Sequence, residues 1–209
     1  MEHFKEVFEI LINSEKLIQY GGLTLLLIVI FAETGVFFGF IFPGDALLFT
    51  AGLLCNTQLE ISIYWLVISV ALAAIVGNIT GFFTGKYLGK RIFQKKDTRF
   101  FKQEHIQKTH QYYEKYGGFA LIGGRFLPVI RTFVPILAGA IDMNFWKFTL
   151  FNCCGAILWS GTFIPMGYLI GRKFPASLDH IEYFILGITI ITMTIFLRGI
   201  YKMNKRKKQ

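Results

Sequence analysis

Four ionisable residues lie inside apolar stretches of this sequence. Glu33 and Asp45 belong to the run FAETGVFFGFIFPGDALLFTAG, and Arg125 and Arg131 belong to the run FALIGGRFLPVIRTFVPILAG. A charged side chain at membrane depth costs from about 3 to more than 10 kcal/mol, so it usually faces protein, water or a ligand. Guanidinium groups bind phosphate oxygens through a planar fork, and buried carboxylates can take up protons. The pattern predicts a polar site inside a membrane, with arginines for a phosphate and acids for charge pairing or proton coupling.

A second interpretation of the same four residues stays open. Glu33, Asp45, Arg125 and Arg131 could form a fixed ion-pair cluster that holds two segments together. A buried arginine pair without a counter-ion is costly, so either the acids or an anionic substrate must compensate it. The two interpretations are compatible, because an ion pair that is closed in one state can open in another.

The composition indicates an all-α polytopic membrane protein forming one integral-membrane domain over 1–209. The chain has 209 residues, 54% of them hydrophobic, which is too apolar for a soluble domain of this size. Full spans are predicted at about 17–33, 61–84, 145–171 and 181–201. Residues 1–16 predict an amphipathic helix at the membrane surface.

Two further apolar segments, 34–54 and 117–141, are interrupted by glycine and proline. The residues expected to break or shape them are Pro43 and Gly44 in the first, and Pro128, Pro135 and Gly139 in the second. Irregular backbone at membrane depth is tolerated only where protein or a water-filled cavity covers it. Both segments are therefore predicted to be re-entrant helical hairpins.

The basic residues set the predicted topology. The connector 86–116 carries nine Lys/Arg against three acids, and the tail 202–209 carries five Lys/Arg and no acid. Such clusters mark the cytoplasmic side and attract anionic lipids, a simpler explanation than nucleic-acid binding. With both clusters inside, both termini are cytoplasmic, and the hairpins enter from opposite faces. The pair Arg172–Lys173, placed outside, is the one discordant feature.

This layout is an inverted repeat, in which a hairpin followed by a span occurs twice in opposite orientations. Both hairpins end in Ala-Gly, and GKYLGKRIF (85–93) is similar to GYLIGRKF (167–174). Chance similarity between apolar, glycine-rich segments is the alternative. Inverted repeats with broken helices are typical of secondary transporters.

Small residues at i, i+4 spacing permit close helix packing, and this role is expected for Gly77, Gly81, Gly85 and Gly89.

The motifs and their order resemble the DedA family of bacterial inner-membrane proteins, also called the VTT-domain or SNARE-associated superfamily. The matching pieces cover roughly residues 20–175. They are ETG at 33–35, FPGD at 42–45, the glycine series at 77–89, GRFLPVIRTFVP at 124–135, and FNCCGAILW at 151–159. Many members carry two prolines around the acidic loop, whereas Pro43 is alone here.

The resemblance implies two facing re-entrant loops, an important acidic pair (Glu33 and Asp45) and an important arginine pair (Arg125 and Arg131). It further implies lipid-carrier transport across the bacterial cytoplasmic membrane, with undecaprenyl phosphate as the expected substrate and proton coupling commonly proposed. A phosphatidylethanolamine scramblase and a proton- or cation-coupled ion transporter remain alternatives. A homo-oligomer is compatible with the sequence.

An enzyme is not expected. A lipid phosphatase would need a nucleophilic histidine near the arginines, and none of the four histidines lies near them in sequence. Cys55, Cys153 and Cys154 form no CxxC pattern and have no histidine at ligand spacing, so neither a metal nor a cofactor is predicted.

Overall fold

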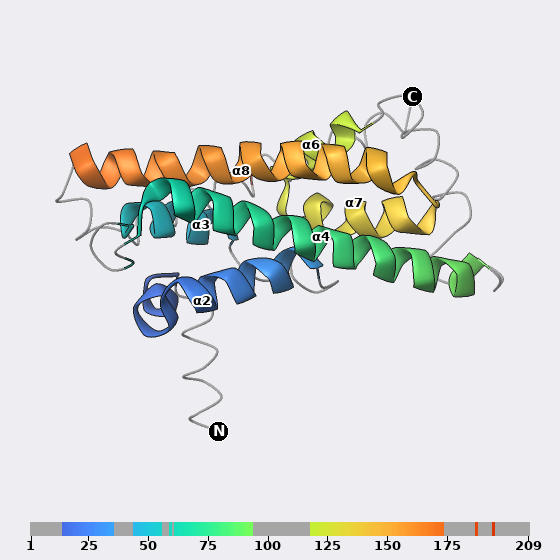
Figure 1. Cartoon of the computed structure of the whole chain (residues 1–209), viewed down its shortest axis with the longest axis horizontal. Coiled ribbons are helices and arrows are strands. Elements are labelled where there is room, and N and C mark those ends of the chain that lie inside the picture. The colour runs from blue at the N-terminus through green and yellow to red at the C-terminus, as the bar shows by residue number, and fades with distance from the viewer. Residues whose placement is uncertain are drawn as a thin grey trace, which may run out of the picture. The chain divides into compact units, whose positions relative to one another are not determined.

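The computed structural model describes residues 14–35, 44–55, 61–93 and 118–173, together with Leu59, Gly187 and Thr194. The regular elements in these ranges are α-helices (Figure 1). They are α2 (Ser14–Gly35), α3 (Gly44–Leu53), α4 (Ile63–Phe93), α6 (Phe119–Gly124), α7 (Pro128–Ala140) and α8 (Phe145–Lys173). The predicted all-helical class is confirmed for the part of the chain that the structure describes.

In the part of the chain that the structure describes, two helices are long and apolar enough to cross a bilayer. They cover Ile63–Leu88, with 26 residues, and Phe145–Lys173, with 29 residues. A helix of about 20 residues crosses the hydrocarbon core, so both exceed the requirement. They correspond to the predicted spans 61–84 and 145–171. Helix α4 continues to Phe93, because the Lys and Arg residues at its end favour helix.

The first predicted span, 17–33, is not one straight helix. Helix α2 changes direction at Gly22, whose φ of 53° and ψ of −147° are not helical. Glycine adopts this conformation because it has no Cβ. The apolar part of the helix, Gly21–Gly35, would extend at most about 22 Å, less than the roughly 30 Å of hydrocarbon. It is therefore one of the shorter apolar helices.

Several predictions concern residues outside the described ranges. These are the N-terminal helix up to residue 13, the middle of the first hairpin (36–43, including Pro43), and the connector from residue 94 to 117. The predicted span 181–201, apart from Gly187 and Thr194, and the tail 202–209 also lie outside them. These remain predictions.

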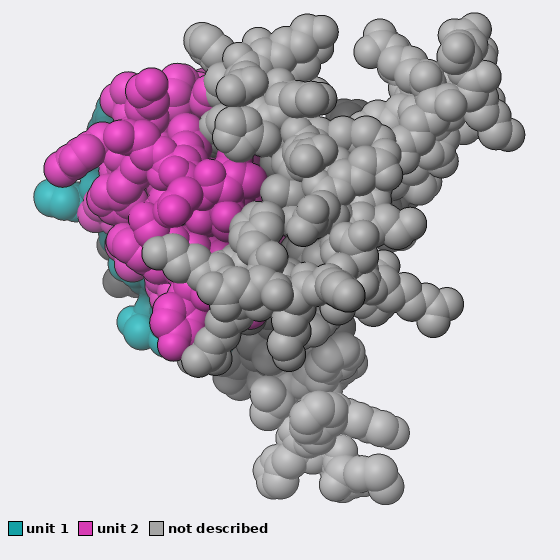
Figure 2. Space-filling model, turned by 90° about the vertical axis from the view of Figure 1, so that its right-hand side faces the viewer, with its two compact units in different colours: residues 1–29, 42–70, 160–209 teal, residues 30–41, 71–159 magenta. Residues whose placement is uncertain are grey.

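The chain divides into two compact units (Figure 2). Unit 1 comprises residues 1–29, 42–70 and 160–209, and unit 2 comprises residues 30–41 and 71–159. Helices α2, α4 and α8 each contribute residues to both units. Each unit has a short helix packed on a long one.

In unit 1, α3 and the second half of α8 approach backbone to backbone. A Cβ added at Gly52 of α3 would overlap the carbonyl oxygen of Ile164 in α8. A Cβ added at Gly167 of α8 would overlap the carbonyl oxygen of Phe49 in α3. The contact is reciprocal and requires glycine on both helices, because no larger side chain fits between the backbones.

Unit 2 contains the same arrangement between α7 and the second half of α4. A Cβ at Gly139 of α7 would overlap the carbonyl oxygen of Phe82, and a Cβ at Gly85 of α4 would overlap that of Ile136. Each of the four helices thus carries both a contact glycine and a contacted carbonyl. In every case the carbonyl lies three residues before the glycine of the same helix. The two short helices therefore pack on their long helices in the same register.

The segment predicted as the second hairpin contains α6 and α7. The helices are interrupted at residues 125–127, directly before Pro128, which is the first residue of α7. Proline favours this position because its missing N–H would have no helical partner there. Pro135 was expected to break the segment, but it lies inside α7, which continues to Ala140. Prolines inside membrane helices are tolerated where other groups satisfy the freed carbonyl.

Candidate functional site

Glu33 and Arg131 form a buried ion pair within unit 2. Glu33 lies two residues before the end of α2, and Arg131 lies in the first turns of α7. Arg131 Nη2 donates a hydrogen bond to Glu33 Oε1. Arg131 is 3% exposed and Glu33 is 0% exposed, so neither charge is solvated by water. The pair joins two segments that are 98 residues apart in the sequence.

Arg125 lies in the interruption between α6 and α7 and is also buried. Its Nη1 donates to Asn152 Oδ1 at 2.8 Å and to the Asn152 carbonyl oxygen at 3.3 Å. A Cβ added at Gly155, one turn after Asn152 on α8, would lie 3.4 Å from Arg125 Cδ. Helix α8 therefore leaves room for the arginine stem and supplies acceptors for its head.

One tryptophan contacts both arginines. The guanidinium carbon of Arg131 lies 4.9 Å from the centroid of the Trp159 ring, and that of Arg125 lies 5.6 Å from it. Trp159 is fully buried. A cation over an aromatic face gains about 2 kcal/mol or more when both are desolvated. Trp159 thus stabilises two charges at the same place.

A pair of buried amides completes the arrangement. Asn78 of α4 donates through Nδ2 to Asn152 Oδ1 at 2.8 Å, and Asn152 Nδ2 donates to the Ile75 carbonyl oxygen at 3.1 Å. In the opposite orientation of the Asn78 amide, its oxygen accepts from Arg125 Nη1 at 2.9 Å and its nitrogen donates to the Thr34 carbonyl oxygen at 3.1 Å. Both orientations place the Asn78 amide beside Arg125.

The fourth predicted site residue belongs to the other unit. Asp45 is the second residue of α3, in unit 1, and is 5% exposed. A carboxylate in the first turn of a helix is stabilised by the positive end of the helix dipole. The structure thus brings together Glu33, Arg125 and Arg131 within unit 2, and the meeting of Asp45 with these three residues remains a prediction.

The glycines of α4 pack against two neighbours within unit 2. A Cβ at Gly77 would meet Thr34 Oγ1 and the Phe31 carbonyl oxygen of α2. Gly81 and Gly85 face α7, with Gly85 the closer of the two. The surroundings of Gly89 lie outside the described residues. This packing sets the positions from which Glu33 and Arg131 reach each other.

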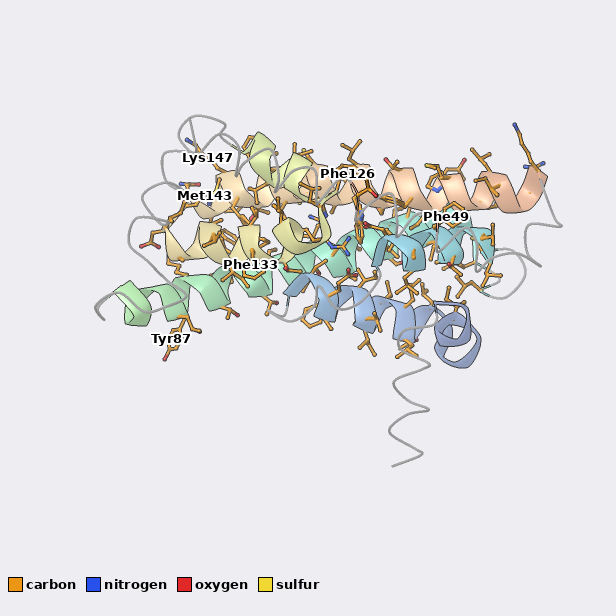
Figure 3. The ribbon with its side chains drawn as sticks, turned by 180° about the vertical axis from the view of Figure 1, so that it is seen from behind. Phe49, Tyr87, Phe126, Phe133, Met143 and Lys147 are labelled. Carbon is orange, nitrogen blue, oxygen red and sulfur yellow. The ribbon has the colours of Figure 1, made fainter. Side chains whose placement is uncertain are left out.

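Aromatic residues occur at the ends of the two long helices. Tyr64 and Trp65 near the start of α4, Tyr87 near its end and Trp146 near the start of α8 are all exposed. Figure 3 shows Tyr87 projecting away from α4. The 22-residue interval between Trp65 and Tyr87 corresponds to about 33 Å of helix, close to the hydrocarbon thickness. Such aromatic residues are enriched at membrane–water interfaces.

Sequence reasoning did not identify Asn152 as a site residue. It is a single amide inside an otherwise apolar span, and this was the available signal, because polar side chains in a span usually face protein. Its partner could not be inferred from spacing, since Asn152 and Arg125 lie on different helical segments. No group of three His, Cys, Asp or Glu side chains within the described ranges could hold a metal ion.

Comparison with known proteins establishes the family. The VTT domain matches residues 42–169, more than half of the 209 residues. Protein DedA of Escherichia coli K12 is 33% identical over 198 residues, covering 93% of this chain and 89% of that protein. This chain belongs to the DedA family. It is therefore a membrane protein with a VTT domain, as the motifs predicted.

Other DedA-family relatives are similarly long. An uncharacterized membrane protein of Mycobacterium leprae is 39% identical over 182 residues, covering 87% of this chain and 81% of the relative. Inner membrane protein YqjA of Escherichia coli K12 is 25% identical over 176 residues, covering 84% of this chain and 79% of that protein. None of these three relatives is named as an enzyme. No solved structure matches the chain.

Proposed function

We propose that this DedA-family protein transports a phosphate-bearing lipid, undecaprenyl phosphate, across the bacterial cytoplasmic membrane. The observation that carries the proposal is the pair of buried arginines over Trp159, of which only Arg131 is joined to Glu33. A guanidinium group offers parallel N–H donors that match the oxygens of a phosphate. Two such cations buried in a membrane protein are well suited to a lipid headgroup that carries negative charge.

The carboxylates supply the second half of the proposed mechanism. Without substrate, Glu33 offsets the charge of Arg131. An arriving phosphate competes for the guanidinium group and displaces the carboxylate. A buried carboxylate that loses its cationic partner binds a proton more readily, so phosphate movement and proton movement become linked. We assign Asp45 the equivalent carboxylate role in unit 1.

The proposed topology has four spans and two hairpins that enter from opposite faces, with both termini in the cytoplasm. Two contacts support it. Lys86 Nζ lies 2.8 Å from Asp142 Oδ1 in unit 2, and the topology places both residues on the cytoplasmic side. In unit 1, Gly171 packs against Leu53, and the topology places both on the outer side.

The matching glycine contacts support the inverted repeat. Each short helix packs on the long helix of the other repeat, because α3 contacts α8 and α7 contacts α4. Repeats that exchange conformations provide alternating access to a site near the midplane. The basic connector and tail would contact anionic lipids of the inner leaflet.

Reconstitution in liposomes tests the proposal. Purified protein would be inserted into vesicles that contain labelled undecaprenyl phosphate or labelled phosphatidylethanolamine, and headgroup exposure would be followed together with internal pH. We expect accelerated movement of undecaprenyl phosphate relative to empty vesicles. Movement of phosphatidylethanolamine alone would favour the scramblase. Proton flux without lipid movement would favour the ion transporter, a function for which Glu33 is also suited.

A further inference from the structure

The two buried arginines differ in the charge of their partners. Arg131 donates to the carboxylate of Glu33, so its positive charge is compensated. Arg125 donates through Nη1 to the side-chain and main-chain oxygens of Asn152, which are neutral. Among the described residues, no carboxylate is paired with Arg125. The site within unit 2 therefore holds one compensated and one uncompensated cation.

Among the described residues, no acceptor lies against the opposite edge of the Arg125 guanidinium group. Its Nε and Nη2 atoms are buried and have no hydrogen-bond partner within the part of the chain that the structure describes. Arg125 is 2% exposed. Buried donors without partners carry a desolvation penalty of about 1 to 3 kcal/mol each, and more for charged groups. The Nε–H and Nη2–H groups lie along one edge of the planar guanidinium group. Together they can donate hydrogen bonds to two oxygens of one phosphate group.

The asparagines fix this edge without neutralising it. Asn152 is held by its own bond to the Ile75 carbonyl oxygen, so its acceptor oxygen is fixed against Arg125 Nη1. An aspartate at either position would accept the same hydrogen bond but would add a negative charge about 3 Å from the cation. A neutral amide is therefore the residue type that orients Arg125 and leaves its charge for a ligand.

We propose that Arg125 is the anion receptor of the site, and that Asn152 and Asn78 are positioning residues that hold it in an uncompensated state. Arg131, paired with Glu33, is the member that exchanges partners when the anion arrives. The inference rests on the proposed phosphate-lipid function and assigns a different role to each of the two arginines. The ligand class is a phosphomonoester, whose second negative charge an uncompensated cation favours.

Asn152→Asp tests this division, with Asn144→Asp as the matched control. Asn144 is exposed at the start of α8, where its Oδ1 accepts from the backbone N–H groups of Trp146 and Lys147 at 3.0 and 3.2 Å. Aspartate caps a helix equally well, so the control makes the same chemical change away from the arginines. Binding of farnesyl phosphate and of inorganic phosphate to detergent-purified protein would be measured by calorimetry.

We expect Asn152→Asp to weaken farnesyl phosphate binding by about tenfold or more, since the new carboxylate competes for Arg125. Asn144→Asp should bind as the wild type does. Wild-type affinity should rise as pH passes through about 6, where a phosphomonoester gains its second charge, and this rise should flatten in Asn152→Asp. A purely structural role for Asn152 would not change the pH profile.

The outcomes separate the inference from the proposed function. If the wild type binds farnesyl phosphate and a folded Asn152→Asp binds it equally well, the receptor assignment is wrong and the transport proposal stands. If the wild type binds neither probe, both are wrong. Tighter binding of farnesyl phosphate than of inorganic phosphate identifies a lipid ligand, and equal binding identifies the free anion. If Asn152→Asp does not fold, Asn78→Asp decides by the same criteria, because the Asn78 amide also lies beside Arg125 Nη1.

Discussion

Arg131 of α7 donates a hydrogen bond to Glu33 of α2, and both side chains are buried. The pair connects the first described helix to the second predicted hairpin. Because neither residue is exposed, the removal of one partner takes a charge-assisted hydrogen bond from a buried charge, and water cannot replace that bond. This relationship makes the stability of unit 2 depend on two residues that are also proposed to act on the substrate.

Neutralising one member of this pair should therefore destabilise the protein. We expect Glu33→Gln to cost about 3 to 5 kcal/mol, the range for breaking a buried ion pair, as a lower thermal unfolding temperature in detergent. The double variant Glu33→Gln/Arg131→Gln removes both charges and should recover most of the loss. If the double variant is no more stable than Glu33→Gln, the two residues do not act as a pair.

The glycine contacts predict a strong dependence on residue size. Gly139→Ala would place a Cβ on the carbonyl oxygen of Phe82, and a backbone atom cannot move aside as a flexible side chain can. Overpacking of this kind costs about 1 to 3 kcal/mol. Gly161→Ala, in α8, is the control, because nothing lies within 4 Å of its Cβ position. It should be neutral or slightly stabilising, since alanine favours helix. Equal unfolding temperatures for the two variants would contradict the close approach of α7 and α4.

Gly52→Ala should have a similar effect in unit 1. Its Cβ would overlap the carbonyl oxygen of Ile164, the counterpart of the Gly139 contact. If the repeats are equivalent, the two alanine variants should lower the unfolding temperature by similar amounts. A loss at Gly139 with none at Gly52 would indicate that the two short helices are packed differently.

The proposed topology predicts which cysteines can be labelled from each side. In a cysteine-free background, Asn144→Cys should react with a membrane-impermeant maleimide only when the cytoplasmic face is open to it. Lys173→Cys, at the end of α8, should react only from the outside. Both positions are exposed in the structure, so access depends on the membrane side alone. Labelling of both from the same side would contradict the orientation of α8.

Much of the fold and part of the site could be predicted from the sequence. The length and apolar character of residues 61–84 and 145–171 indicate spans, because the bilayer sets a minimum length. The buried charges at Glu33 and Arg131 indicate a site, since their cost requires compensation. The kink at Gly22 and the continuity of α7 through Pro135 could not be predicted, because glycine and proline permit either a break or a continuous helix.

The partners of the charges depend on tertiary structure. The sequence presents Arg125 and Arg131 as equivalent members of one motif, six residues apart. Only the packing of α8 places Asn152 and Trp159 beside them and leaves Glu33 for Arg131. A spacing within one segment carries no information about which residues of another segment will face it, and so the difference between the arginines appears only in the structure.

A guanidinium fork in the membrane is proposed to move a lipid phosphate. The direct measurement is the translocation rate of labelled undecaprenyl phosphate in liposomes that contain wild-type protein or Arg125→Lys, matched for protein content. Lysine keeps the charge but lacks the planar fork. We expect a rate for Arg125→Lys lower by about tenfold or more, corresponding to a loss of about 1.4 kcal/mol or more. A rate equal to that of the wild type would contradict it.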